Sequence, residues 1–242
     1  MYATADDVAK LGTILGIWAH PDDETWCSGA LMTLAAANGQ RVVCITASYG
    51  EAGETADESQ WPQVRLGEIR RHEMVASMRI LGITEHSWLG YPDGKLAIVD
   101  QTQAVSRLAR AISRYQPDTI VTFGPDGLTG HPDHQQVYRW SLAARQALAS
   151  PAQILCATES AEKYALAGEQ CDDEWNIYLT VGQPYTKPEA AMDLCLKLDG
   201  ELLDLKCRAL QAQASQYAHM FKDESGRRAV RAIIGSECFV RA

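Results

Sequence analysis

Short apolar runs alternate with longer amphipathic stretches through roughly the first two thirds of the chain. The short runs are continuously apolar and rich in Val and Ile, which is typical of strands buried on both faces of a sheet. The longer stretches repeat apolar residues every three or four positions, which predicts helices packed against that sheet. Strands that alternate with helices predict an α/β fold, with a mostly parallel sheet and helices on both faces. The predicted strands are 14–19, 41–47, 86–89 and 119–124, and the predicted helices are 21–37, 66–81, 135–149 and one that begins after a cap at Asp100.

The pattern is looser after residue 150. It predicts strands at 154–158, 177–181 and 236–240 and one helix at 201–216. No internal repeat, low-complexity segment or clear linker interrupts the sequence, so we expect a single domain over residues 1–242.

A polar, acidic and glycine-containing segment, residues 48–62, is too long for a tight connection. Loops of this length in compact domains usually carry function or are disordered. We therefore expect this loop to border the active site and to be mobile.

Composition narrows the class of protein. The chain has 46% hydrophobic and 22% charged residues, as ordinary soluble globular proteins do. A net charge of −9 argues against nucleic acid or an anionic membrane as the main partner. No apolar run approaches the roughly 18 residues of a membrane span, and the acidic segment 1–10 lacks the layout of a signal peptide. We therefore expect a cytoplasmic protein.

Seven cysteines are scattered along the chain without a C-x-x-C pair. An odd number in this arrangement argues against a disulfide framework and against a thiolate zinc cluster. Because most of them lie in apolar contexts, we expect most to be buried free thiols.

Two short motifs carry the chemistry of this sequence: His20-Pro21-Asp22-Asp23-Glu24 and His131-Pro132-Asp133-His134. Each follows a predicted strand and opens a predicted helix, and that edge of an open α/β sheet is where ligands bind. Either histidine alone would be explained as an ordinary hydrogen-bonded residue, and acidic residues in a first helical turn complement the helix dipole. However, three of the six histidines fall in these two frames, and this joint pattern favours a site.

The residue types in the motifs suit a water-activating metal. Zinc chemistry needs a few fixed ligands and one open position, and His20, Asp23 and His134 supply two nitrogens and one oxygen. Zn²⁺ is the expected metal, although a site of this kind also accepts Fe²⁺ or Co²⁺.

The other polar residues of the motifs suit proton transfer. Asp22 adjoins a ligand and is the candidate general base. His131, protonated and oriented by Asp133, is the candidate to stabilise an oxyanion. Glu24 either supports a ligand through a hydrogen bond or complements the helix dipole.

These motifs resemble those of the PIG-L/LmbE-like zinc de-N-acetylase family, and the resemblance spans nearly the whole chain. The first motif is specific, whereas the C-terminal matches alone would be weak. The matching segments are Ala19-His20-Pro21-Asp22-Asp23-Glu24, Arg70-x-x-Glu73, Leu81-Gly82, Pro92-Asp93-Gly94, Gly130-His131-Pro132-Asp133-His134, Lys206, Ala209-Leu210, Ser215-Gln216 and Glu237-x-Phe239.

The resemblance implies a Rossmann-like fold and a metal-dependent hydrolase that removes an N-acyl group, N-acetyl by default, from an amino sugar or related small-molecule amine. By position it implies the same ligands, His20, Asp23 and His134, with Asp22 as base and His131 at the oxyanion. Two further residues match the family's pattern and have ordinary alternatives. Arg70 matches an arginine turned towards substrate but could also be an exposed partner of Glu73, and Asp93 could line the pocket or merely form a turn.

Two alternatives stay open at this stage. One is an amidase that acts on a thiol-sugar conjugate or another N-acyl compound. The other is a non-catalytic metal-containing binding protein, which would not need Asp22 or His131. The exact substrate, the native metal, the donor of the proton to the leaving amine and any homo-oligomer are left open. Trp26, Trp61 and Trp88 could stack on a sugar, but core packing is the more common use of such residues and is the expectation for each.

Overall fold

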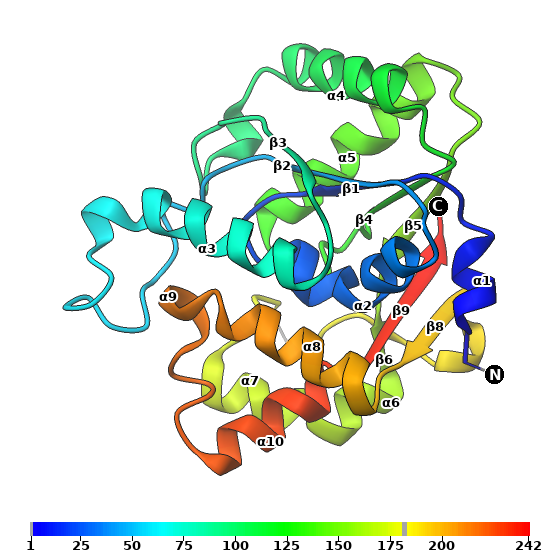
Figure 1. Cartoon of the computed structure of the whole chain (residues 1–242). Helices are drawn as coiled ribbons and strands as arrows, with labels where there is room; N and C mark the ends of the chain where they lie inside the picture. Colours follow the sequence, from blue (N-terminus) through cyan, green and yellow to red (C-terminus); the bar gives the residue numbers. More distant parts are fainter. Residues whose placement is uncertain (1, 181–182) are drawn as a thin grey trace.

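In the computed structural model, which describes residues 2–180 and 183–242, the core is a seven-stranded sheet with the order β3-β2-β1-β4-β5-β9-β8 (Figure 1). The first five strands in the chain pair in parallel, and the last two pair antiparallel at one edge. The strands are β1 (Ile14–Trp18), β2 (Val42–Thr46), β3 (Glu85–Trp88), β4 (Thr119–Phe123), β5 (Gln153–Ala157), β8 (Leu194–Lys197) and β9 (Ser236–Arg241). This order confirms the predicted α/β fold with a mostly parallel sheet.

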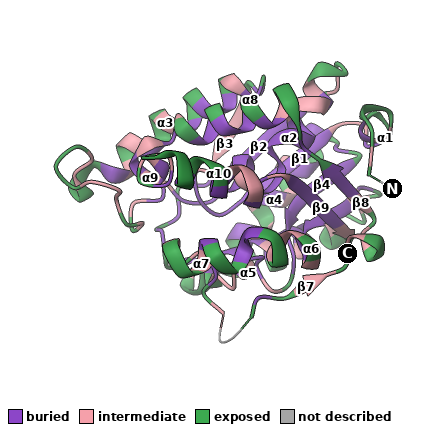
Figure 2. Cartoon of the chain, turned by 90° about the horizontal axis from the view of Figure 1, so that it is seen from below, coloured by how far each residue is buried: buried purple, intermediate pink, exposed green. Residues whose placement is uncertain are grey.

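Helices cover both faces of the sheet, as predicted. On one face α2 (Asp23–Ala37) and α3 (Leu66–Ile80) both contact α8 (Gly200–Gln211), and on the other α4 (Gln101–Tyr115) packs against α5 (Pro132–Ala147) (Figure 1). Every residue of β1, β2 and β4 is buried between these layers, which explains their continuous apolar sequences (Figure 2). The Asp100 carboxylate accepts the N–H groups of Thr102 and Gln103, and so caps α4 as predicted.

Shorter elements complete the chain. They are α1 (Ala5–Ala9), η1 (Gln63–Arg65), η2 (Leu96–Ile98), β6 (Glu159–Ser160), α6 (Ala161–Lys163), the π-helix η3 (Tyr164–Gly168), α7 (Glu169–Trp175), β7 (Thr186–Lys187), η4 (Glu189–Ala191), α9 (Ala214–Tyr217) and α10 (Glu224–Ile233). None of the helices within 2–180 and 183–242 is both long and apolar enough to cross a membrane.

The region after residue 150 differs from two of the predictions. Of the predicted strand 177–181, residue 181 lies outside the described residues, and 177–180 is a loop in which the Leu179 N–H donates to the Thr129 carbonyl. The predicted helix 201–216 is broken between α8 and α9 at Gln213, whose ψ is 54°. The Gln213 side chain is buried there and donates to Thr25 and Ser77, so tertiary hydrogen bonds outweigh the helical pattern.

Helix α2 contains a kink at Ser28, where φ is −148°. The Lys206 ammonium donates to the Trp26 carbonyl before the kink, and the Glu237 carboxylate accepts the N–H of Ala30 and of the next residue after it. Lys206 and Glu237 also form a buried ion pair with an Nζ–Oε1 distance of 2.7 Å. The pair satisfies the backbone groups that the kink frees, and it fixes the first turn of α2.

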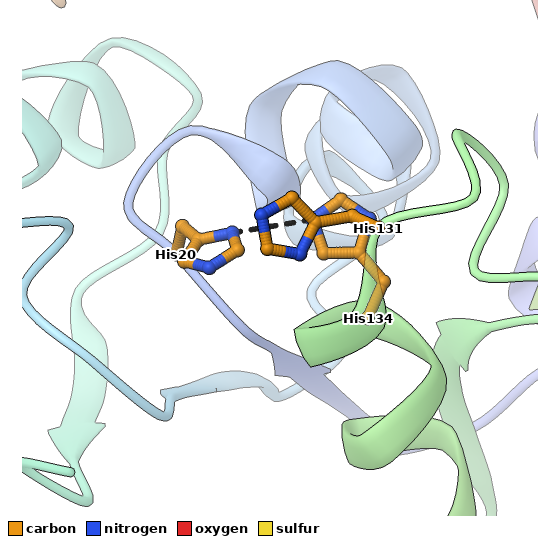
Figure 3. Close-up of side chains that lie close together, drawn as sticks. All are labelled: His20, His131 and His134. Atoms are coloured by element: carbon orange, nitrogen blue, oxygen red, sulfur yellow. Dashed lines mark hydrogen bonds between the residues drawn. The ribbon is translucent and has the colours of Figure 1, made fainter. Parts of the chain in front are cut away.

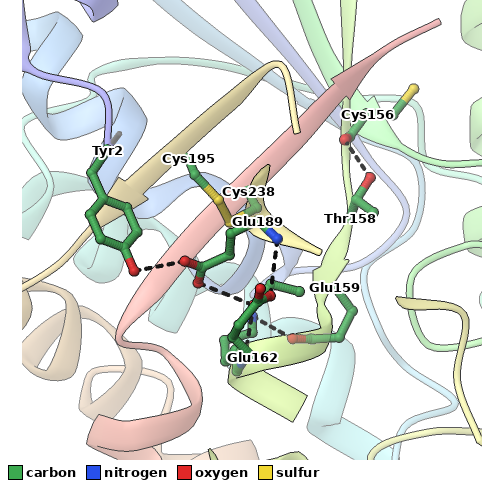
Figure 4. Close-up of a disulfide and its surroundings, with 10 residues drawn as sticks. Tyr2, Cys156, Thr158, Glu159, Glu162, Glu189, Cys195 and Cys238 are labelled. Atoms are coloured by element: carbon green, nitrogen blue, oxygen red, sulfur yellow. Dashed lines mark hydrogen bonds and ion pairs between the residues drawn. A yellow bond between two sulfur atoms is a disulfide. The ribbon is translucent and has the colours of Figure 1, made fainter. Parts of the chain in front are cut away.

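One cysteine pair is the exception to the expectation that most cysteines are free thiols. Cys195 and Cys238 face each other in the register of β8 and β9 and form a disulfide (Figure 4). The remaining cysteines of the described chain are buried and free, as expected: Cys27, Cys44, Cys156, Cys171 and Cys207.

Candidate active site

The two histidine motifs meet at the carboxyl ends of the adjacent strands β1 and β4 (Figure 3). Strand order reverses between these strands, and such a point of a parallel sheet is where ligands bind. His20 follows β1, whereas His131 and His134 lie at the start of α5 after β4. One nitrogen from each ring lies within 4.8 Å of the others, so the three imidazoles form a candidate metal site. The prediction that the motifs come together is therefore confirmed.

Hydrogen bonds fix the orientation of two of these rings. His20 Nε2 lies 3.0 Å from Asp93 Oδ1, and His134 Nδ1 lies 2.9 Å from the Gly127 carbonyl. In its neutral form, each ring directs its proton towards this fixed acceptor and keeps a lone pair on its other nitrogen. These other nitrogens, His20 Nδ1 and His134 Nε2, face each other at 3.2 Å. A cation between them would satisfy both lone pairs.

Asp23 adds an oxygen to this pair of nitrogens. Its Oδ2 accepts the N–H groups of Ala19 and His20 and lies 3.6 Å from His20 Nδ1. Its Oδ1 lies 3.3 Å from His134 Nε2. Ligands about 2.0–2.2 Å from a tetrahedral zinc ion lie about 3.3–3.6 Å from one another. The spacing of these donors therefore fits a small divalent cation.

Asp22 has a strained backbone beside these donors. Its φ is 107°, which L residues rarely adopt, and its N–H donates to the fully buried Glu24 carboxylate. Glu24 thus positions Asp22. This role differs from both roles expected from the sequence, which were support of a metal ligand and complementing the helix dipole. Burial raises the pKa of the Asp22 carboxyl to about 6, against the opposing charge of Arg70.

Arg70 is buried rather than exposed and is bound to the loop that carries Asp22. Its guanidinium donates to the Gly50 carbonyl at 3.0 Å, to the Pro21 carbonyl at 2.6 Å and to Asp22 Oδ2 at 3.1 Å. Glu73 instead accepts the N–H and hydroxyl of Ser215. The alternative of an exposed Arg70–Glu73 pair is therefore wrong.

His131 and Asp133 interact differently from the expectation. His131 Nδ1 accepts the backbone N–H of Asp133 at 3.1 Å, whereas the Asp133 carboxylate accepts the N–H groups of Gly94 and Leu96. The peptide of Asp133, not its carboxylate, therefore orients His131. Burial lowers the pKa of the His131 ring, which favours its neutral form. A neutral ring whose Nδ1 accepts a hydrogen bond carries its proton on Nε2 and still donates.

Asp93 combines both roles that the sequence left open for it. It lines the cavity, and its carboxylate also accepts the N–H groups of Ala52 and Gly94, which fixes the turn. Burial opposes ionisation, but the hydrogen bond from His20 outweighs it and lowers the pKa of Asp93. No pattern in the sequence indicates that Asp93 is the partner of His20, because the two residues are far apart along the chain.

A cavity of about 400 Å³ opens beside the histidines. Most of the residues that line it are polar, and the loop 48–62 contributes Ala52, Gly53 and Glu54, so the expectation that this loop borders the cavity is confirmed. The loop's mobility stays a prediction. The whole lining is His20, Asp22, Asp23, Ala52, Gly53, Glu54, Arg70, Asp93, Gly94, Thr129, His131, His134, Asn176, Ile177, Leu179 and Gln216.

A second cavity of about 120 Å³ adjoins the same donors and is mostly apolar. Trp26 lines it and stacks on Tyr217, whereas Trp88 contacts the rings of Tyr49 and His86. Sequence reasoning missed the part of this lining that follows residue 150, where the pattern is loose. The lining is Asp22, Asp23, Trp26, Cys27, Leu128, Thr129, His134, Ile177, Tyr217 and Met220.

Known proteins resemble this chain in sequence and in fold. One relative is the 1D-myo-inositol 2-acetamido-2-deoxy-alpha-D-glucopyranoside deacetylase of Streptomyces scabiei. It is 35% identical to this chain over 160 residues, which cover 57% of this chain and 50% of that protein. The chain thus spans about half the length of the first curated relatives it matches.

Two solved structures share the fold. The N,N'-diacetylchitobiose deacetylase of Pyrococcus horikoshii has a TM-score of 0.65 and 20% identity, with 99% of this chain and 87% of that chain covered. The 4-carboxy-2-hydroxymuconate hydratase of Pseudomonas putida has a TM-score of 0.61 and 20% identity, with 96% of each chain covered. Because these two proteins are named for different reactions, this likeness establishes the fold and not the reaction.

The family assignment rests on the sequence. The model of the PIG-L family, described as GlcNAc-PI de-N-acetylase, matches residues 15–147, which include both histidine motifs. Because this match covers more than half of the chain, the protein belongs to the PIG-L/LmbE de-N-acetylase family.

Proposed function

We propose that this protein is a divalent-metal-dependent hydrolase that removes an N-acetyl group from an amino sugar conjugate. The observation that carries the proposal is the pair of facing imidazole nitrogens, 3.2 Å apart, with the Asp23 carboxylate and the Asp22 carboxylate beside them. The family and the names of its relatives support an acetamido sugar as the substrate.

His20 Nδ1, Asp23 and His134 Nε2 would hold the metal, and zinc is the first choice because nitrogen and carboxylate ligands suit it. Iron(II) or cobalt(II) would also suit this donor set. When bound, such a cation acidifies a water molecule and polarises the acyl oxygen.

Asp22 serves as the general base. Its pKa of about 6 keeps the Asp22 carboxylate ionised at neutral pH. This pKa also lies close enough to neutral pH for the group to accept and return a proton. Arg70 and Glu24 hold it in place through the hydrogen bonds described above, so both act as positioning residues. Arg70 also lines the larger cavity, where its guanidinium could meet a sugar hydroxyl.

His131 stabilises the oxyanion that develops on the acyl oxygen. Its neutral ring donates through Nε2, because Nδ1 accepts the Asp133 N–H. The proton for the leaving amine comes from Asp22, which has just received one from water. With Asp22 as the proton donor, His131 stays neutral throughout the reaction, and no second general acid is needed.

The larger cavity supports a sugar as the substrate. Carboxylate, amide and guanidinium groups line it, from Asp93, Gln216, Asn176 and Arg70. Such groups pair with hydroxyls, which a sugar presents on every side.

The test is release of free amine from N-acetylglucosamine, its inositol conjugate and diacetylchitobiose. The protein is stripped with a chelator, reloaded with zinc, iron(II) or cobalt(II), and assayed beside an Asp22→Asn control. We expect metal-dependent release of amine from at least one sugar. Release only from an added N-acyl thiol-sugar conjugate would favour that alternative, and bound metal with no amine from any compound would favour a binding protein.

A further inference from the structure

We propose that the smaller cavity binds the acyl chain of the substrate and makes this protein prefer N-acyl groups longer than acetyl. The inference rests on the proposed amide hydrolysis and adds a choice of acyl group to it. It concerns residues that the proposed mechanism does not use, chiefly Trp26, Cys27, Leu128 and Met220.

The two cavities flank the same catalytic groups. Both are lined by Asp22, Asp23 and His134, but only the larger lining includes His131 and Asp93. The amide of a bound substrate therefore has room for a substituent on each side of its carbonyl carbon.

The chemistry of each cavity's lining indicates which end of the substrate that cavity binds. At a tetrahedral acyl carbon, the amine and the alkyl group point in different directions. The hydroxyls of the amine portion match the polar side chains of the larger cavity, whereas an alkyl chain loses its contact with water in the smaller, mostly apolar one. Trp26, stacked on Tyr217 with ring centroids 5.9 Å apart, gives this cavity a rigid wall.

Leu128 provides a second, independent observation. Its φ is 64°, a left-handed conformation that glycine or asparagine adopts far more readily than leucine. The side chain is nevertheless buried, with 6% of it exposed, and lines the apolar cavity. Strained residues concentrate at ligand sites, and here the strain keeps an apolar wall next to Thr129 and His134.

The size of the cavity indicates the length of the chain. A methyl group would leave most of the 120 Å³ empty. For comparison, an apolar protein cavity of about 150 Å³ holds benzene, which has six carbons. The cavity therefore suits an acyl group of about four carbons, such as butyryl.

The experiment compares glucosamines that carry acetyl, propionyl, butyryl and octanoyl groups, with the zinc-loaded protein. We expect kcat/KM to rise about fourfold per added methylene, which is the gain for burying one, up to butyryl, and to fall at octanoyl. If acetyl is hydrolysed fastest and each longer chain is slower, the inference is wrong although the proposed function stands. If no chain is hydrolysed with any metal, the proposed function fails with it.

Variants test whether the preference for longer acyl groups arises in the smaller cavity. Cys27→Leu should fill the cavity and lower the ratio of butyryl to acetyl kcat/KM by at least tenfold, whereas Met220→Ala should enlarge it and shift the optimum to longer chains. The matched control is Cys207→Leu, since Cys207 is also a free cysteine with 7% exposure but borders a different cavity. Equal ratios in Cys27→Leu and Cys207→Leu would overturn the inference. If Cys27→Leu does not fold, an unchanged optimum in Met220→Ala would overturn it as well.

Discussion

Replacing Asp22 by Asn should make the metal-free protein more stable while it removes most of the activity. Burial raises the pKa of Asp22 from 3.8 to about 6 in the folded chain. Ionisation of this carboxylate therefore destabilises the fold at neutral pH. At 1.36 kcal/mol per pKa unit, the difference of about two units corresponds to at most about 3 kcal/mol. Asn removes the charge but keeps an oxygen that can accept the hydrogen bond from Arg70.

The gain in stability should depend on pH in a defined way. Below about pH 4 the carboxyl group is protonated in both states, so wild type and variant should be equally stable. Between about pH 4 and pH 6 only the unfolded wild type loses the proton, so its free energy of unfolding should fall relative to that of the variant. Above about pH 6 both states are ionised, and the difference should stay constant.

The assay is urea unfolding of chelator-treated protein at pH 4, 5, 6 and 7.5. The control is Asp173→Asn, an exposed aspartate on α7, which should change stability by no more than about 0.5 kcal/mol. A variant Asp22→Asn that is no more stable than wild type at pH 7.5, or equally stabilised at every pH, would refute the reasoning from burial.

The same preparation tests the catalytic role. Asn at position 22 leaves the proposed ligands intact but lacks the basic oxygen. Metal content should therefore match wild type while turnover falls by roughly 10²–10⁴-fold, the usual contribution of general acid–base catalysis. Loss of metal with Asp22→Asn and retention with Asp23→Ala would mean that the two aspartates have the opposite roles.

Four further predictions follow from the site and its supports. Asp23→Ala removes a proposed ligand, so metal affinity and rate should fall together, as elemental analysis and amine release would measure. His131→Ala should keep its metal and lose rate, and full activity would exclude its role at the oxyanion. Lys206→Met should lower the free energy of unfolding by about 3–5 kcal/mol, because Glu237 is left buried without its cation, and a second change, Glu237→Gln, should restore part of it. The loop 48–62 should exchange its amide hydrogens faster than the core strands and slow down when substrate analogue binds, and protection equal to the core in both states would contradict this.

The first half of the fold could be predicted because its signals are local. Strands β1, β2 and β4 are buried on both faces, so their sequences are continuously apolar and easy to recognise. After residue 150 the signals fail where tertiary contacts decide the backbone. Helix α8 ends at Gln211, two residues before Gln213, which turns its amide into a buried polar cluster. The disulfide likewise depends on the register of β8 and β9, which cysteine spacing does not encode.

By itself the sequence determined the presence of a site and most of its chemical groups. Each motif is a strand end followed by a proline and a first helical turn, so a short stretch of chain places its histidines and aspartates at the edge of the sheet. Only the tertiary structure decided how these groups are used. The partners of His20 and Asp22 come from distant segments of the chain, and the partner of His131 is a backbone N–H group. Sequence periodicity reports which face of an element is buried, but not which side chain of another element lies against it, and that packing also makes the apolar cavity.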